Sequence, residues 1–175
     1  MKKDAIITLP NSHLRQKSQR VHVITDETRQ LVADMTSASI DWENSRPHEI
    51  SAALAAVQID QLERVVIVRE DFDDKDNRTF IPLINPEIVK YEGQLVSDYE
   101  GCLSVSGRIY GKVPRYSRVR VKALDINGNT IRLKADGFLA RVLQHEIDHC
   151  NGIVFIDRIR DDTSAFYQLD EKGEL

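Results

Sequence analysis

Two histidines four residues apart, with a glutamate beside the first, form the part of the sequence best suited to chemistry. They lie in the segment HEIDH at residues 145–149. Four residues make about one turn of a helix, so His145 and His149 point the same way and can bind one metal ion. Glu146 lies about 100° around the helix, where a carboxylate can move protons on activated water. The alternative is a purely structural pair of histidines.

A catalytic metal also needs a third protein ligand and an open position. Cys102 stands out because Gly101, directly before it, allows close approach of the backbone to a bound ligand. On chemistry alone, Cys102 is either this ligand or an inert buried thiol. Cys150 points about 100° away from His149 on the predicted helix, so we expect it to pack in the core. The other histidines are expected on the surface or satisfied in the core: His13, His22 and His48.

Two helices are predicted to organise the chain. The first covers about 25–39, where apolar residues recur at helical spacing. The second covers 137–150 and carries the HExxH motif, with Asp136 expected to cap its start. Asn151-Gly152 should end this helix, because both residues tolerate the left-handed conformation.

Short strands are predicted at 65–68 and 81–84, the second ended by the Asn-Pro pair that follows it. Alternating apolar residues at 119–123 and 131–133 predict a hairpin, with a type I′ turn at Asn127-Gly128. The order of strands and helices does not follow a βαβ alternation. The predicted fold class is therefore α+β, with mixed or antiparallel strands packed around a central helix that carries HExxH.

Composition indicates an ordinary globular protein. The 175 residues are 41% hydrophobic and 30% charged, so a single catalytic domain is expected over 1–175. A net charge of −4 provides no excess positive charge for a phosphate backbone, which argues against direct sequence-specific nucleic-acid binding. Two cysteines fit a reducing compartment. With no signal-peptide core and no apolar run near the ~18 residues of a membrane span, we expect a cytoplasmic protein without a membrane partner.

Three ordered motifs make the chain closely resemble the peptide deformylases. They read SAALAAVQ at 51–58, EGCLS at 100–104 and QHEIDH at 144–149, where the family carries GxGLAAxQ, EGCLS and QHExDH. The resemblance continues through VPRY at 113–116 and NGIVFIDRI at 151–159. It implies a metal-dependent hydrolase that removes the N-formyl group from the N-terminal formyl-methionine of nascent peptides and releases formate.

The same resemblance implies a role for each site residue. One divalent metal ion, Fe²⁺ in the cell with Zn²⁺ or Ni²⁺ as substitutes, would be held by Cys102, His145 and His149. Glu146 would act as general base and acid. The side-chain amide of Gln58 and the backbone N–H of Leu103 would hold the oxyanion. Substrate-binding positions would be Ala52, Ala53, Gly101, Phe138 and Val142.

The resemblance also implies partners and supporting contacts. The expected partners would be N-formyl-methionyl peptides and the ribosome near the nascent-chain exit. Glu100 and Arg115 are expected to form an ion pair that fixes the EGCLS loop, with two unrelated surface charges as the alternative. Asp148 is either an orienting group behind the metal or a plain surface carboxylate.

The chain departs from the family motifs at three positions, and Cys150 stands where the family commonly has an aliphatic residue. The two glycines of the first motif are Ser51 and Ala53 here, and the proline usual after Leu-Ser-x is Ser106. A β-carbon at Ala53 could narrow the peptide channel, or force a different backbone angle if the glycine used positive φ. If both family glycines have ordinary strand dihedral angles, the small replacements cost little. Two other functions therefore stay open. One is a non-catalytic or altered-specificity relative that binds metal and peptide N-termini, and the other is an HExxH protease.

Overall fold

The computed structural model describes residues 1–46, 48–105, 109–159 and 166–168. None of the helices in these residues is long and apolar enough to cross a membrane. The helices are α1 (Asp26–Asn44) and α2 (Gly137–Cys150), with short 3₁₀ turns η1 (Lys3–Ala5), η2 (Ser12–Arg15), η3 (Ala56–Ile59) and η4 (Phe155–Arg158). The strands are β1 (Ala53–Ala55), β2 (Val65–Arg69), β3 (Phe80–Glu100), β4 (Ile109–Leu124), β5 (Thr130–Asp136) and β6 (Phe166–Gln168).

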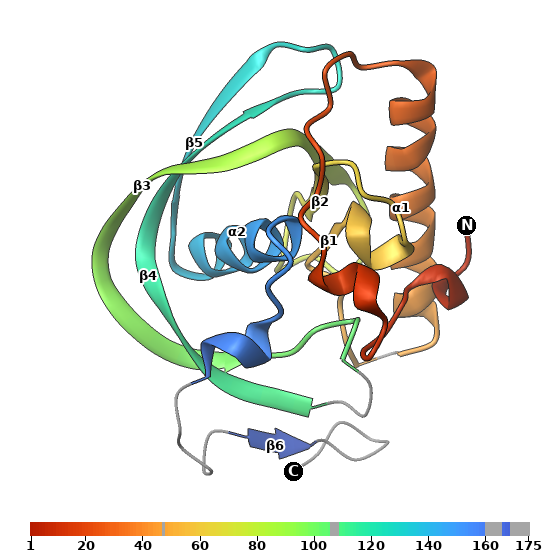
Figure 1. Ribbon diagram of the computed structural model, residues 1–175. Coiled ribbons are helices and arrows are strands. Elements are labelled where there is room, and N and C mark those ends of the chain that lie inside the picture. The colour runs from red at the N-terminus through yellow and green to blue at the C-terminus, as the bar shows by residue number, and fades with distance from the viewer. Residues whose placement is uncertain (47, 106–108, 160–165, 169–175) are drawn as a thin grey trace.

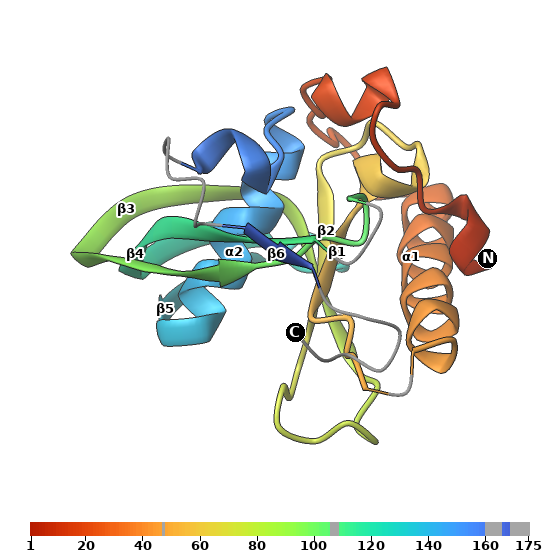
Figure 2. The same ribbon diagram turned by 90° about the horizontal axis from the view of Figure 1, so that it is seen from below.

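One antiparallel sheet organises these elements. Its strand order is β1-β2-β3-β4-β5, and β6 pairs with β4. Figure 1 shows α2 inside the curve of β3, β4 and β5, while α1 lies on the other side of β1 and β2. Figure 2, seen from below, shows the same separation of the two helices by the sheet. The predicted α+β class with antiparallel strands is confirmed.

Helix α2 forms where it was predicted because its apolar side chains share one face. Leu143 and Ile147 are buried in the same core cluster as Val119 and Val121 of β4. The helix ends at Cys150, and Gly152 follows with φ +75°. The expected ends are only partly right. Asn151 has φ −103°, so the glycine alone is left-handed, and Asp136 stands at the N-cap position without a side-chain capping bond.

Helix α1 extends five residues beyond the predicted end at residue 39. Two residues of the extension are buried: Trp42 is 9% exposed and Glu43 is 1% exposed. Trp42 joins Leu31 and Met35 in the core cluster between α1 and β2. Tertiary packing, which the local pattern underestimates, therefore sets where α1 stops.

The predicted strand at 65–68 is confirmed as β2, but the predicted end of the next strand is wrong. β3 runs through Asn85-Pro86 and continues for 21 residues in total. Asn85 has φ +53°, and the pairing with β4 shifts between Ile84 and Glu87. The Asn85 side chain accepts from the Val21 N–H at 2.9 Å and donates to the Val21 carbonyl at 2.8 Å. This tertiary contact stabilises an irregularity after which the strand resumes.

The predicted hairpin of β4 and β5 forms, but its turn is not type I′. Only Gly128 in the turn has positive φ, at +86°, whereas a type I′ turn needs two such residues. The Asp125 N–H donates to the Asn129 carbonyl at 2.9 Å, which leaves a three-residue loop. The Asp125 carboxylate accepts the N–H groups of Asn127 and Asn129, each at 2.8 Å.

Replacing Gly152 with alanine should destabilise the protein by about 2–3 kcal/mol, because positive φ is strained for alanine and a backbone contact is added. A β-carbon there would lie 2.5 Å from the Arg15 carbonyl oxygen. Urea unfolding measures the change. Gly128→Ala is the control, because its β-carbon would meet nothing closer than 4.0 Å. Equal losses in the two variants would contradict the role of the Arg15 contact.

Candidate active site

Three side chains from two elements converge on one point. His145 and His149 lie one turn apart on α2, and Cys102 comes from the loop between β3 and β4. The Nε2 atoms of the two histidines are 3.2 Å apart, and the Cys102 Sγ lies 3.2 Å from His149 Nε2. The three donor atoms all lie within 4.8 Å of one another. Among the described residues, no other group of histidine, cysteine or acidic side chains converges in this way.

The donor set fits a divalent metal ion. In a tetrahedral site with metal–nitrogen bonds of about 2.0–2.1 Å and a metal–sulfur bond of about 2.3 Å, the donors lie roughly 3.3–3.6 Å apart. The separations from His149 Nε2 to Cys102 Sγ and to His145 Nε2, each 3.2 Å, are close to this range. The Gln58 amide and the Ser104 N–H both donate to the Cys102 sulfur, at 3.5 and 3.4 Å, which fixes the position of the sulfur.

The two histidines are held in different ways. His145 Nδ1 lies 2.9 Å from Glu100 Oε2, a contact that fixes the ring and leaves Nε2 for a metal. His149 is fully buried, and its Nδ1 has no hydrogen-bond partner among the residues described. Packing in the core therefore orients His149, whereas a carboxylate orients His145.

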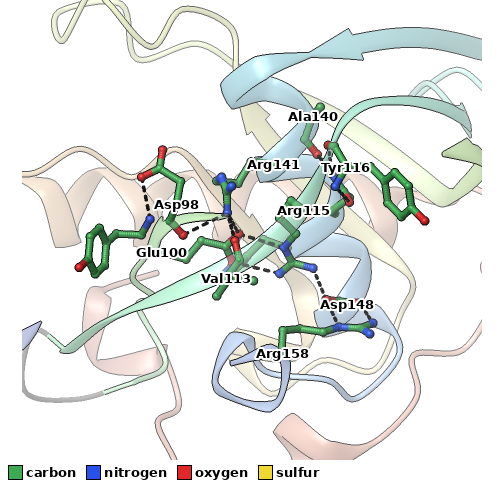
Figure 3. A network of polar contacts seen from close by, with 12 residues as sticks. Asp98, Glu100, Val113, Arg115, Tyr116, Ala140, Arg141, Asp148 and Arg158 are labelled. Carbon is green, nitrogen blue, oxygen red and sulfur yellow. Dashed lines mark hydrogen bonds and ion pairs between the residues drawn. The ribbon is translucent and has the colours of Figure 1, made fainter. Parts of the chain in front are cut away.

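A buried ionic network extends from Glu100 (Figure 3). Glu100 accepts from Arg115 Nε and Nη2 at 2.9 and 3.0 Å and from Arg141 Nη1 at 2.8 Å. Burial by itself would raise the pKa of Glu100, but hydrogen bonds from His145 and Arg115 outweigh it and hold that pKa well below its usual range. The predicted Glu100–Arg115 pair is confirmed, and it joins the EGCLS loop to β4.

Asp148 is neither a surface carboxylate nor a direct partner of a predicted ligand. It is 7% exposed, lies 2.5 Å from Arg115 Nη1, and accepts from Arg158 at 2.7 and 3.0 Å. Figure 3 shows Arg115 between Glu100 and Asp148. Asp148 therefore acts on His145 only through Arg115 and Glu100.

Glu146 lies beside the donor atoms, in a position largely shielded from solvent. It is 5% exposed, and its Oε2 has no hydrogen-bond partner within the described part of the chain. Burial raises the pKa of Glu146 to about 7, although the nearby His145 opposes the shift. A carboxyl group with a pKa near neutrality can both accept and donate a proton at physiological pH.

Gln58 has an amide whose orientation is fixed. Its Oε1 accepts the Ala55 N–H at 2.8 Å, so its NH₂ group must face the Cys102 sulfur and the Ser104 hydroxyl. Gln58 is 1% exposed. It offers a preorganised donor at the wall of the site, which is what stabilisation of a developing oxyanion requires.

A cavity of about 520 Å³ opens beside these groups. Its wall includes every predicted catalytic and substrate-binding residue: Ala52, Ala53, Gln58, Gly101, Leu103, Phe138, Val142 and Glu146. Cys102 and His145 also line it, while His149 lies behind them in the core. Cys150 is fully buried, and burial raises the pKa of its thiol to about 12, which fits the packing role expected of it.

Known proteins are similar to this chain in both sequence and fold. The family described as Polypeptide deformylase matches residues 3–165. The chain belongs to the polypeptide deformylase family. A curated relative from Thermomicrobium roseum, named peptide deformylase, is 45% identical over 97% of this chain and 93% of its own length. One from Halothermothrix orenii, with the same name, is 42% identical over 83% of this chain and 86% of its own length.

Solved structures of the family agree with the fold. A peptide deformylase from Synechococcus elongatus, in complex with actinonin, matches with a TM-score of 0.81 and 35% identity. The match covers 97% of this chain and 88% of that one. A peptide deformylase from Legionella pneumophila matches with a TM-score of 0.76 and 36% identity, over 89% of this chain and 85% of that one.

Two of the departures from the deformylase motifs can be judged from the backbone. Neither Ser51 nor Ala53 has a positive φ, so the non-glycine residues impose no left-handed strain. Ser51 is fully buried, and Ala53 packs in the core cluster below α2 while also lining the cavity. The third departure, Ser106, lies outside the described residues.

Arg141 is the main cavity residue that the sequence reasoning missed. It lies one helical turn before His145 and is 8% exposed. Besides Glu100, it donates to the Val113 carbonyl at 2.9 Å and to the Val96 carbonyl at 2.8 Å. The i, i+4 spacing from His145 places both residues on one face of α2, and this spacing could have identified it. Tyr110 also lines the cavity, and no local pattern indicates it.

Glu100→Gln should weaken metal binding by about 10–100-fold, the usual loss when a partner behind a metal-bound histidine is removed. The variant keeps the volume of the side chain but loses the carboxylate that orients His145. Competition with a chelator for Zn²⁺ measures the affinity. Glu92→Gln, which breaks an exposed pair with Arg120, is the control. Unchanged affinity in Glu100→Gln would show that packing alone positions His145.

Proposed function

We propose that this chain is a metal-dependent hydrolase that removes the N-formyl group from the N-terminal formyl-methionine of nascent peptides and releases formate. The observation that carries the proposal is the convergence of Cys102, His145 and His149 beside the buried Glu146. Membership of the deformylase family supports the choice of reaction. The cavity beside these residues supports a substrate of peptide size.

The donor set would hold one divalent ion through one thiolate and two imidazoles. When bound, the ion would supply a Lewis acid that lowers the pKa of water from 15.7 toward about 7. Fe²⁺ is the ion proposed for the cell, with Zn²⁺ or Ni²⁺ as substitutes. Intrinsic affinity favours Zn²⁺ over Fe²⁺, so occupancy will depend on supply and handling.

Glu146 would move the proton that the reaction requires. It would accept a proton from the attacking water as the new bond to the formyl carbon forms. It would then donate that proton to the methionine nitrogen as the carbon–nitrogen bond breaks, so that formate and a free amine leave. Its burial and its pKa of about 7 support both steps.

Gln58 and Leu103 would stabilise the negative charge that develops on the formyl oxygen. The Gln58 amide already faces the site because the Ala55 N–H fixes its orientation. Leu103 lies in the same wall, and its backbone N–H would be the second donor. In comparable sites one such donor is worth about 3–4 kcal/mol in the transition state.

The substrate would bind as an extended strand. β1 lies at the edge of the sheet, and Ala52 and Ala53 line the cavity. An edge strand offers backbone groups with which a peptide can pair. Gly101 would contact the peptide from the opposite wall. Phe138 and Val142 of α2 would enclose the methionine side chain.

We further propose that residues 1–175 form one catalytic domain that acts in the cytoplasm near the ribosomal exit. The single sheet that connects β1 to β5 supports one domain. A non-catalytic peptide-binding relative is not favoured, because the donor set, Glu146 and Gln58 are all in place. The combination of a thiolate donor with the EGCLS loop argues against a general HExxH protease.

Glu146→Ala should abolish formate release from formyl-Met peptides, with a loss of about 10²–10⁴-fold in kcat, because proton transfer loses its carrier. Metal content should stay at one equivalent, because Glu146 is not one of the converging donors. Formate release by anaerobically iron-loaded protein, together with metal analysis, checks both expectations. Glu63→Ala, at an exposed glutamate, is the control. Normal turnover in Glu146→Ala would refute the assigned role.

A further inference from the structure

A buried ion pair lies behind the peptide-binding wall and is not part of the catalytic group. Glu43, at the end of α1, and Arg69, at the end of β2, both have side chains that are 0% exposed. Arg69 Nη1 lies 2.5 Å from Glu43 Oε1. Neither residue lines the cavity. Any influence on substrate must therefore pass through the groups they contact.

The first contacts hold the segment that leads into β1. Glu43 Oε1 accepts the Ser51 N–H at 2.7 Å. The backbone N–H of Arg69 donates to the Ala52 carbonyl at 2.9 Å, next to the Ala53–Val68 pair of the β1–β2 ladder. The Glu43 carboxylate therefore fixes Ser51, and the backbone of Arg69 fixes Ala52 next to it, directly before the edge strand.

The remaining contacts hold the loop that follows β2. Arg69 Nε donates to the Asp71 carbonyl at 3.1 Å, and its Nη2 donates to the Lys75 carbonyl at 2.7 Å. Between these two carbonyls, Phe72 packs edge-to-face on Phe138, with ring centroids 4.9 Å apart. Phe138 lines the cavity, so the guanidinium group supports that wall through Phe72, while its partner Glu43 holds Ser51 on the β1 side.

The pair is poorly explained by stability alone. A buried ion pair can often be replaced by apolar residues of similar volume without loss of stability. Here the second carboxylate oxygen, Glu43 Oε2, has no hydrogen-bond partner in the described ranges, and Arg78 Nε lies 3.9 Å from it. What the charges do provide is a fixed direction for the Ser51 N–H and the two loop carbonyls.

We propose that Glu43 and Arg69 are positioning residues that hold β1 in register with the peptide substrate, so that they determine binding of the residues that follow formyl-methionine. The inference rests on the proposed deformylase function. Because the pair acts on the backbone before β1, its effect should grow with the length of peptide that pairs there. A substrate that ends at methionine should hardly depend on it.

The test compares two substrates in the double variant Glu43→Met/Arg69→Met, using iron-loaded full-length protein. The loss of kcat/KM should be about tenfold larger for formyl-Met-Ala-Ser than for formyl-methionine amide, mainly through KM. Any effect through Phe72 on the methionine pocket acts on both substrates and cancels in this ratio. Equal losses on the two substrates, or no loss, would overturn the proposal.

A conservative variant and an exchange measurement separate positioning from general damage. Glu43→Gln keeps an acceptor for the Ser51 N–H but leaves the Arg69 charge without its counter-ion, so its ratio of losses should exceed that of wild type and stay below that of the double variant. In the double variant, the Ser51 amide should exchange with solvent faster, while amides of the β4–β5 ladder keep their protection. Faster exchange in both places would indicate a merely structural role and overturn the proposal.

Arg69→Lys keeps the test decisive if the double variant does not fold. A lysine keeps the charge, but its ammonium cannot reach Glu43 and both loop carbonyls at once. In Arg69→Lys, the loss of kcat/KM should again be larger for formyl-Met-Ala-Ser than for formyl-methionine amide. A ratio of the two losses near one would overturn the proposal. If wild-type protein releases no formate from either substrate, the proposed function fails instead, and Ser51 exchange still tests the positioning role.

Discussion

The site depends on one buried carboxylate, that of Glu100, which brings together a strand end, a neighbouring strand and a helix. It contacts His145 and Arg141 of α2 and Arg115 of β4, all within 3.0 Å. Leaving any of these groups unpaired in the interior would be costly, so the loop after β3 has little freedom. Because the loop is held there, Cys102, two residues after Glu100, lies next to the histidines of α2. The geometry of the donor set thus follows from charge pairing as much as from packing.

The same fold meets two opposite demands. The reacting groups need a rigid setting shielded from solvent, which α2 provides by burying Glu146 and His149. The substrate needs an open edge, which β1 provides at the end of the strand order. Glu43 and Arg69 serve both requirements, because they hold the edge strand β1 in place and do not themselves line the cavity. Binding energy from peptide residues far from the formyl group can then be used to orient it.

Local sequence predicted the parts of the molecule that local physics decides. The bounds of α2 followed from apolar periodicity and from Gly152, and the convergence of His145 and His149 followed from helical spacing. The end of β3 could not be predicted, because the irregularity at Asn85 depends on a contact with Val21, 64 residues away. The partners of the buried charges could not be predicted from the sequence either. Nothing in the local pattern pairs Glu43 with Arg69. Local chemistry left Cys102 as either a ligand or an inert thiol, and the motif resemblance favoured the ligand.

X-ray absorption at the iron edge of the anaerobically loaded protein tests the central claim most directly, because it reports which atoms surround the ion. The account predicts one sulfur and two imidazole nitrogens from the protein, with the remaining coordination from a light atom such as oxygen. That shell would establish that Cys102 and both histidines of α2 bind the same ion. A shell without sulfur, or with a single imidazole, would contradict the account.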